Sequence, residues 1–211
     1  MITLYSMPSS GNSYKVRLLL AQLNIPFRHV ATEYENGKEL TVQPDFRNKN
    51  PNGKVPLVEF EDGRVLAESN AILLHFAEGT PFLPTDAYTR ALVYQWMFFE
   101  QNSHEGSIAV RSAITYRYPY RFHEATPERL ESLLQSGNRA LDVMESQLQK
   151  TPYLAGEAYT VADIALYAYT HSAEPGGFDI ASRPGISNWL ERVRNQPGHV
   201  PLEWTPDNAS A

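Results

Sequence analysis

The 211-residue sequence contains no cysteine. This absence excludes disulfides, thiolate metal sites and cysteine nucleophiles. It is also consistent with a reducing compartment, and we expect the protein in the cytoplasm.

Long apolar runs and an excess of positive charge are absent as well. No stretch approaches the roughly 18 apolar residues of a membrane-spanning helix, and the start, Met1 to Tyr5, resembles a first strand more than a targeting segment. With 18 basic and 24 acidic residues the net charge is −6, which disfavours nucleic acid or an anionic membrane as the main partner. No set of His, Asp and Glu has the spacing of metal ligands, so we expect no metal.

The composition that remains, 42% hydrophobic and 20% charged, is that of an ordinary globular protein. In the first part, residues 2–5 and 27–31 have the pattern of strands. Between them, apolar residues spaced by three and four positions predict an amphipathic helix; these are Val16, Leu19, Leu20 and Leu23. This order predicts a parallel pair of strands with a right-handed crossover.

Residues 32–54 are polar and irregular in pattern. Strands are expected at 55–60 and 64–66, joined by the turn signal Glu61-Asp62-Gly63. A helix is expected after Glu68, with Ser69 as its N-cap. The first domain therefore has the order βαβ followed by ββα.

The alternation stops at a proline-rich connector, and the remainder has helical patterns. Helical regions are expected at about 88–116, from Thr126-Pro127 onward, from Thr160 onward, and around Ile186 to Val193. We expect domains at residues 1–80 and 88–211, joined by a linker at 81–87. The polar stretch from Pro197 is expected to wrap the surface or fray.

The first candidate for chemistry is the loop before the first helix, which carries four polar side chains: Ser9, Ser10, Asn12 and Ser13. A helix N-terminus has unpaired amides and a partial positive charge, so it stabilises an anion such as a thiolate. A serine hydroxyl is too weak a base to deprotonate a thiol, but it can donate a hydrogen bond to the sulfur anion. Each unit of pKa lowering needs about 1.4 kcal/mol, and one charge-assisted bond supplies about 1.5–3 kcal/mol. The alternative is that these residues only cap the helix.

Two further segments can recognise parts of a peptide. In the segment Asn50 to Pro56, a cis Val55–Pro56 bond would turn the Val55 backbone outward to pair with an extended peptide. Glu68 can bind an ammonium group, and Ser69 with the helix amides can bind a carboxylate, so together they suit a free amino-acid head group. The alternative for this pair is a plain N-cap with an acidic neighbour.

These segments, in this order and spacing, resemble the cytosolic glutathione transferase superfamily, and the resemblance extends from Ile2 to about Pro197. Ser9 to Arg17 resembles a serine-type active-site loop of bacterial-type members, and Asn50 to Pro56 resembles the cis-proline segment. The third match is Glu68-Ser69 with Ala71-Ile72, the γ-glutamyl motif. In the helical half, Thr160-Val161-Ala162-Asp163 resembles the buried capping box of the family.

The resemblance implies a thioredoxin-like glutathione-binding domain followed by an all-helical bundle, the fold of this family. It implies that Ser10 activates the glutathione thiol, with Asn12 as the competing candidate. Lys54 and Val55 would hold the cysteinyl and glycyl parts, and Glu68 and Ser69 the γ-glutamyl end. Many members bind the glycine carboxylate near Thr41 and Gln43, but Thr41 departs from the basic or amide residue usual there.

The resemblance also implies an electrophile pocket lined by the long helix, with five candidates: Tyr94, Phe98, Arg111, Tyr116 and Tyr118. The alternative is that these residues belong to the core, as is usual at helical spacing. His104 and Glu105 suit an acid–base pair, and the alternatives are a polar helix kink or a dimer contact.

The function implied is a glutathione transferase that acts on a small hydrophobic electrophile, with glutathione as co-substrate and a homodimer as the assembly. Three alternatives stay open: a glutathione-dependent disulfide-bond reductase or isomerase on the same site, a non-catalytic binding protein of the same fold, and a carrier of hydrophobic ligands. The absence of cysteine excludes a glutaredoxin-like cysteine mechanism, although glutathione itself could supply both sulfurs.

Overall fold

The computed structural model describes residues 1–32 and 40–206, and these form two compact units. The first unit comprises Met1–Glu78 together with the C-terminal segment from Pro197, and the second comprises Gly79–Gln196. The C-terminal segment therefore belongs with the first unit rather than with the helices that precede it. No helix of the described chain is long and apolar enough to cross a membrane.

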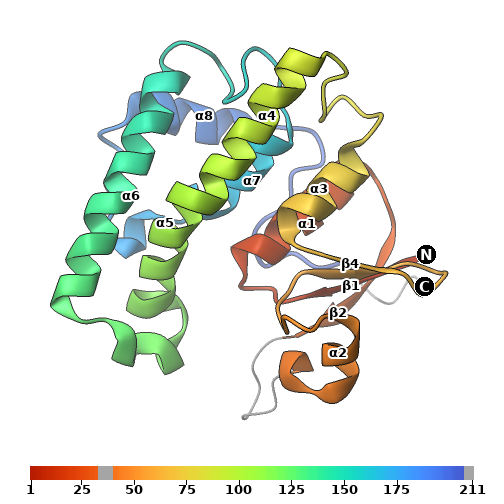
Figure 1. Cartoon of the computed structure of the whole chain (residues 1–211). Helices are drawn as coiled ribbons and strands as arrows, with labels where there is room; N and C mark the ends of the chain where they lie inside the picture. The colour runs from red at the N-terminus through yellow and green to blue at the C-terminus, as the bar shows by residue number, and fades with distance from the viewer. Residues whose placement is uncertain (33–39, 207–211) are drawn as a thin grey trace. The chain divides into compact units, whose positions relative to one another are not determined.

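The first unit contains a four-stranded mixed sheet in the order β2-β1-β3-β4. Strands β1 and β2 are parallel, whereas β3 pairs antiparallel with both β1 and β4. In Figure 1, α1 and α3 lie on one side of this sheet and α2 on the other. The elements are β1 (Ile2–Ser6), α1 (Gly11–Gln22), β2 (Phe27–Ala31), η1 (Leu40–Val42), α2 (Pro44–Lys49), β3 (Leu57–Glu59), β4 (Val65–Ala67) and α3 (Ser69–Ala77).

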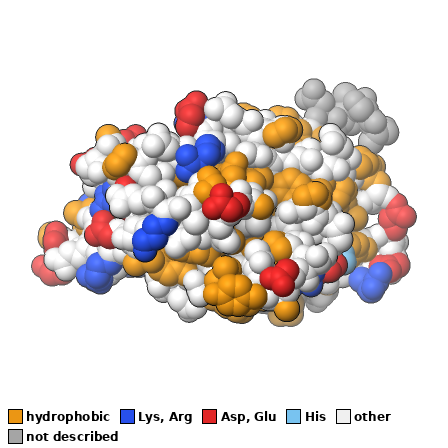
Figure 2. Space-filling model, turned by 90° about the horizontal axis from the view of Figure 1, so that it is seen from above, with side chains coloured by type: hydrophobic (Ala, Val, Ile, Leu, Met, Phe, Trp, Pro, Cys, Tyr) orange, Lys and Arg blue, Asp and Glu red, His pale blue; other side chains and the backbone are white. Residues whose placement is uncertain are grey.

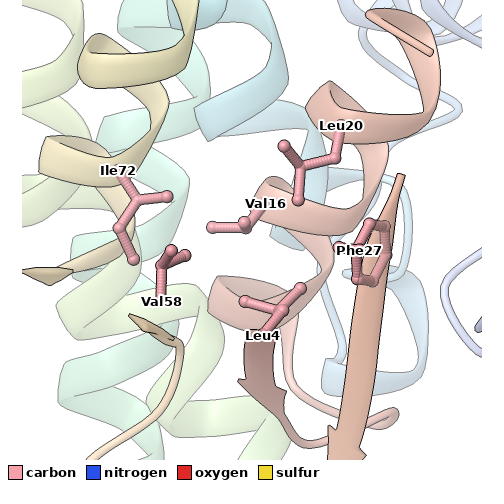
Figure 3. Packing of buried hydrophobic residues seen from close by; sticks show 6 residues of the cluster. All are labelled: Leu4, Val16, Leu20, Phe27, Val58 and Ile72. Atoms are coloured by element: carbon pink, nitrogen blue, oxygen red, sulfur yellow. The ribbon is translucent and has the colours of Figure 1, made fainter. Parts of the chain in front are cut away.

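The core of the first unit lies between the sheet and the pair α1 and α3. Figure 3 shows six buried side chains pointing toward one another from these elements. They are Leu4, Val16, Leu20, Phe27, Val58 and Ile72. Val16 and Leu20, two of the apolar residues that predicted the first helix, thus face the sheet. This packing holds α1 against the sheet and so determines where its N-terminus lies.

In the second unit, the regular elements that the structure describes are helices, apart from an isolated bridge between Tyr153 and Gly156. Two of its segments have π-helical geometry, η2 and η3, and they interrupt the long helical region expected at 88–116. The elements are α4 (Ala87–Phe99), η2 (Glu100–His104), α5 (Glu105–Ser112), η3 (Ala113–Arg117), η4 (Pro119–Glu124), α6 (Pro127–Leu148), α7 (Val161–Thr170), η5 (Glu174–Gly176) and α8 (Pro184–Arg194).

Two local expectations differ from the structure. The irregular stretch expected at 32–54 contains the short helix α2, which packs Phe46 against the ring of Tyr5; residues 33–39 lie outside the described chain. The prediction that Ser69 caps the third helix is wrong, because Glu68 holds the cap position and Ser69 is the first helical residue.

Candidate active site

The three segments singled out in the sequence converge at one end of the sheet. Tyr5 of β1 pairs with Leu57 of β3, and Leu57 pairs with Ala67 of β4. The loop with Ser10 follows the end of β1, Val55 precedes the start of β3, and Glu68 follows the end of β4. Because these strand ends form one rung of the sheet, the topology brings the three segments together.

The N-terminus of α1 is capped by Ser10, whose Oγ accepts a hydrogen bond from the Ser13 amide at 3.3 Å. Because the oxygen is the acceptor in this bond, the hydroxyl hydrogen is not committed to it and can be donated elsewhere. The first turn of α1 contains no acidic side chain. The helix end therefore keeps its partial positive charge for an anion from outside.

Asn12, the second candidate for thiol activation, joins α1 to α3. Its Oδ1 accepts a hydrogen bond from the Ser69 hydroxyl at 3.2 Å. The N-termini of the two helices are therefore tied side by side, and the two candidate anion sites lie within one polar cluster. Ser69 is the first residue of α3, one position past the N-cap, and its hydroxyl bonds to the other helix.

Glu68 is exposed and has φ 69° and ψ 114°, a backbone conformation that a side-chain-bearing residue rarely adopts. Its carbonyl accepts the Ile72 amide at 3.0 Å, which starts the helix without help from the side chain. The carboxylate has no ion pair within the described chain. It is therefore available for a cationic group of a ligand.

The Val55–Pro56 peptide bond is cis, which is the condition on which the sequence argument depended. Within residues 1–32 and 40–206, the Val55 N–H and carbonyl form no hydrogen bond. Val55 is half-buried and Lys54 is exposed beside it. An extended peptide can therefore pair with the Val55 backbone, as a further strand would.

Asn50 is a residue of this site to which the sequence analysis gave no role. It is buried, its side-chain amide donates to the Lys54 carbonyl at 2.8 Å, and its Oδ1 accepts the Asn52 amide. It thereby fixes the turn before Val55. Gly53 in that turn has φ +63°, and a side chain there would collide with the Arg47 guanidinium. The Asn-Pro-Asn-Gly pattern is a turn signal that could have indicated this role.

The remaining candidates in the first unit are less accessible or lack a visible role. Thr41 is buried in η1, whereas Gln43 is exposed at the cap of α2 without a side-chain capping bond. The part of this region at 33–39 lies outside the described residues. Among the residues that are described, no group of three or more His, Asp or Glu is arranged to hold a metal ion.

Two of the five expected electrophile-pocket residues bind backbone carbonyls inside the second unit. The Arg111 guanidinium donates to the carbonyls of Leu130 and Gly176, and the Tyr116 hydroxyl donates to that of Ser172 at 2.8 Å. The Phe98 side chain is 67% exposed. Tyr94 and Tyr118 are half-buried. The hydrogen-bonding atoms of Arg111 and Tyr116 therefore have structural roles.

His104 is fully buried and its Nε2 lies 2.8 Å from the Thr170 hydroxyl. That hydroxyl donates to the Leu166 carbonyl, so His104 is the donor to it. The Glu105 carboxylate accepts from Gln101 at 2.7 Å. These bonds, at the π-helical turn η2, favour the polar helix kink over an acid–base pair.

Comparisons with known proteins agree with this arrangement. The family model "Glutathione S-transferase, N-terminal domain" matches residues 1–78, and "Glutathione S-transferase, C-terminal domain" matches residues 108–197. Together the two models match more than half of the chain. The chain therefore belongs to the glutathione S-transferase family.

Individual relatives cover nearly the whole chain. Disulfide-bond oxidoreductase YfcG of Escherichia coli is 29% identical over 93% of this chain and 92% of its own. Glutathione S-transferase 3 of Zea mays is 30% identical over 99% of both. The crystal structure of a glutathione S-transferase from Pseudomonas fluorescens superposes with a TM-score of 0.90 and 48% identity, over 95% of this chain and 98% of that one.

Proposed function

We propose that the protein is a glutathione transferase that binds glutathione and activates its thiol for attack on a small hydrophobic electrophile. The observation that carries the proposal is the convergence of three recognition elements at one end of the sheet. These are the Ser10-capped helix end, the unbonded Val55 backbone, and the exposed Glu68 carboxylate.

Each element suits a different part of glutathione. Glu68 carries the charge that a γ-glutamyl ammonium requires, and the start of α3 at Ser69 suits its carboxylate. The Val55 N–H and carbonyl suit the cysteinyl backbone, and Lys54 adds a positive charge near the glycyl end. The thiol is then directed to the N-terminus of α1.

The proposed chemistry is stabilisation of a thiolate followed by nucleophilic attack. The thiol proton leaves to solvent, and the Ser10 hydroxyl donates a hydrogen bond to the sulfur anion, with Asn12 as the competing donor. The sulfur then forms a bond to an electrophilic carbon while the bond to the leaving group breaks. The acceleration comes from a larger thiolate population and from proximity.

A second candidate function uses the same site. The relative YfcG is named a disulfide-bond oxidoreductase, and a thiolate at α1 can attack a disulfide sulfur as well as a carbon. Because this chain has no cysteine, the sulfurs exchanged must come from glutathione and the substrate.

Calorimetric titration of glutathione into the full chain tests the proposal. We expect the wild type to bind, and Glu68→Ala to weaken binding about 10- to 100-fold, because a charge-assisted bond is worth about 1.5–3 kcal/mol. Asp62→Asn is the matched control, because it removes a carboxylate of the same unit at the β3–β4 turn, where Asp62 pairs with Arg64.

Absence of wild-type binding at millimolar glutathione would refute the proposal, as would full affinity in Glu68→Ala. Turnover with an aryl halide, a peroxide, a mixed disulfide and maleylacetoacetate then separates the transferase from the reductase and isomerase.

The assembly and location are part of the same proposal. Members of the family are usually homodimers, and on this chain the exposed side chains of Phe98 and Val143 on α4 and α6 suit burial by a second copy. A cleft of about 370 Å³ lies beside Val143, between η2 and α6. Sedimentation velocity of the full chain distinguishes a dimer from a monomer. A cytoplasmic location rests on the absence of cysteine and on the family resemblance.

A further inference from the structure

Arg17 of α1 is a fully buried cation. It binds the loop from Met7 to Ser10, which leads to the helix end proposed to hold the glutathione thiol. Its Nη1 donates to the Met7 carbonyl at 3.2 Å and its Nη2 to the Pro8 carbonyl at 2.8 Å. These are the two residues immediately before Ser9 and Ser10. A planar guanidinium can hold two such acceptors in a fixed relation, which an ammonium group cannot.

The same loop is held a second time by α1 itself. The Met7 amide donates to the Ser13 hydroxyl at 3.1 Å, and the Met7 carbonyl also accepts the Ser10 amide at 3.0 Å. Both backbone groups of Met7 are therefore fixed by α1 or its cap. The position of Ser10 relative to the end of the helix depends on these bonds.

Arg17 also reaches the C-terminal segment, residues 199–204. Its Nη2 donates to the Leu202 carbonyl, and one helical turn earlier the buried Tyr14 hydroxyl donates to the Val200 carbonyl at 2.7 Å. Trp204 then packs edge-on against Phe27 of the core, with ring centroids 6.3 Å apart. The Arg17 side chain thus joins the loop from Met7 to Ser10 to Leu202, which lies 185 positions after Arg17 itself.

One histidine lies close to Arg17, beside the hydroxyl of Ser6. The Nη1 atom also donates to the Ser6 hydroxyl at 2.9 Å, which lies 2.7 Å from His29 Nε2. Burial, with the nearby charge of Arg17, lowers the pKa of His29 below its ordinary value. His29 is therefore neutral at neutral pH, and His199 lies beyond the Tyr14 hydroxyl at 3.3 Å.

We propose that Arg17 and the C-terminal segment are positioning elements for thiol activation. Arg17 fixes the Met7 and Pro8 carbonyls against Leu202, and this sets the direction in which the Ser10 hydroxyl and the first amides of α1 meet the sulfur. The inference rests on the proposed function. It follows from geometry, because a hydrogen bond to sulfur weakens steeply when its donor is misaligned.

Two variants of the full chain test this role. Tyr14→Phe removes only the hydroxyl that holds Val200, and Arg17→Lys keeps the charge but loses the planar fork. The readout is the pKa of the bound glutathione thiol, measured from the ultraviolet absorbance of the thiolate against pH, together with the pH profile of kcat. Tyr153→Phe is the matched control, because its hydroxyl accepts a bond from Gln196 within the second unit.

We expect the bound thiol pKa to rise by about half a unit in Tyr14→Phe and by about one unit in Arg17→Lys, which is a roughly 3- to 10-fold loss of thiolate below the pKa. The acid limb of kcat should move by the same amount, and Tyr153→Phe should match the wild type. A lower melting temperature with an unmoved thiol pKa in Tyr14→Phe would overturn the proposal, since it would show a purely structural role.

If Arg17→Lys does not fold, the result for Tyr14→Phe decides. Failure of the wild type to bind glutathione would be seen first, by calorimetry, and would refute the proposed function and this inference together. Normal binding with an unmoved thiol pKa refutes the inference alone.

Discussion

Two helix N-termini of this protein satisfy their amides in opposite ways. At α7, Thr160 and Asp163 form a capping box, and the carboxylate also accepts bonds from the Leu154 amide at 3.0 Å and the Trp189 indole at 2.9 Å. Asp163 is completely buried. The anion that this helix end requires is therefore part of the chain.

At α1 the first turn supplies no acidic side chain. Ser10 is the cap, and it is half-exposed. The partial positive charge is the same at both ends, but an acidic side chain of the first turn lies against it at α7 and none does at α1. The comparison indicates that a helix end whose first turn lacks an acid is the place to look for an anionic substrate.

The largest effect is expected from removing the internal anion of α7. Asp163→Ala leaves three buried N–H donors without their acceptor, those of Leu154, Thr160 and Trp189. We expect a loss of about 3–5 kcal/mol in the free energy of unfolding, measured by urea denaturation. Glu128→Ala, which removes an exposed acid from the first turn of α6, should cost at most about 1 kcal/mol. Equal costs for the two would contradict the contrast.

The charge of Asp163 gives the same site a pH dependence. Burial raises its pKa from an ordinary 3.8 to about 6, although its hydrogen bonds act in the opposite direction. The folded state thus holds the proton more tightly than the unfolded state, so this stability contribution is complete below about pH 4 and is lost as pH rises through about 6. The shift corresponds to at most about 3 kcal/mol. Asp163→Asn lacks this term, so its deficit relative to wild type should grow from pH 7 to pH 4; a constant deficit would argue against the raised pKa.

A smaller effect is expected at α1, and it appears in the ligand. Ser10→Ala should raise the pKa of the bound glutathione thiol by about one to two units, since one charge-assisted bond is lost. Its effect on the free energy of unfolding should be about 1 kcal/mol, the usual value of a cap. If Asn12→Ala raises the thiol pKa more than Ser10→Ala does, Asn12 is the activating residue.

The smallest effect is expected when α1 is given the acid that α7 has. Asn12→Asp places a carboxylate in the first turn, which should stabilise the helix by about 0.3–1 kcal/mol and raise the bound thiol pKa by up to about one unit. Thermal unfolding and thiolate absorbance measure the two changes, with Asn12→Ala as the uncharged comparison. A thiol pKa equal to that of Asn12→Ala would show that the sulfur does not lie near this helix end.

Local patterns in the sequence were sufficient for much of the fold. The spacing of Val16, Leu19, Leu20 and Leu23 predicted α1, and Thr160 with Asp163 predicted the cap of α7, which the structure confirms. Helix α2 was missed because only Phe46 is buried in its six residues, so no periodicity exists. Pro44 at its first turn was the signal available.

The parts of the candidate site that could not be predicted depend on distant contacts or unusual backbone. The bond from Ser69 to Asn12 joins residues 57 positions apart, so no local pattern could indicate it. The positive φ of Glu68 could not be predicted, because glutamate is not a residue type that favours this backbone conformation. The role of Arg17 could not be predicted either, because its partners Met7 and Leu202 lie near opposite ends of the sequence.

The packing of Trp204 on Phe27 has a consequence for the order of events during synthesis. The core of the first unit includes Trp204 at its edge, yet a ribosome makes this residue after the whole of Gly79–Gln196. The unit whose synthesis begins first must therefore finish last, because its core lacks Trp204 until the chain is nearly complete. A chain stalled near residue 196 should expose the apolar edge that Trp204 packs against in the complete protein, where Phe27 lies.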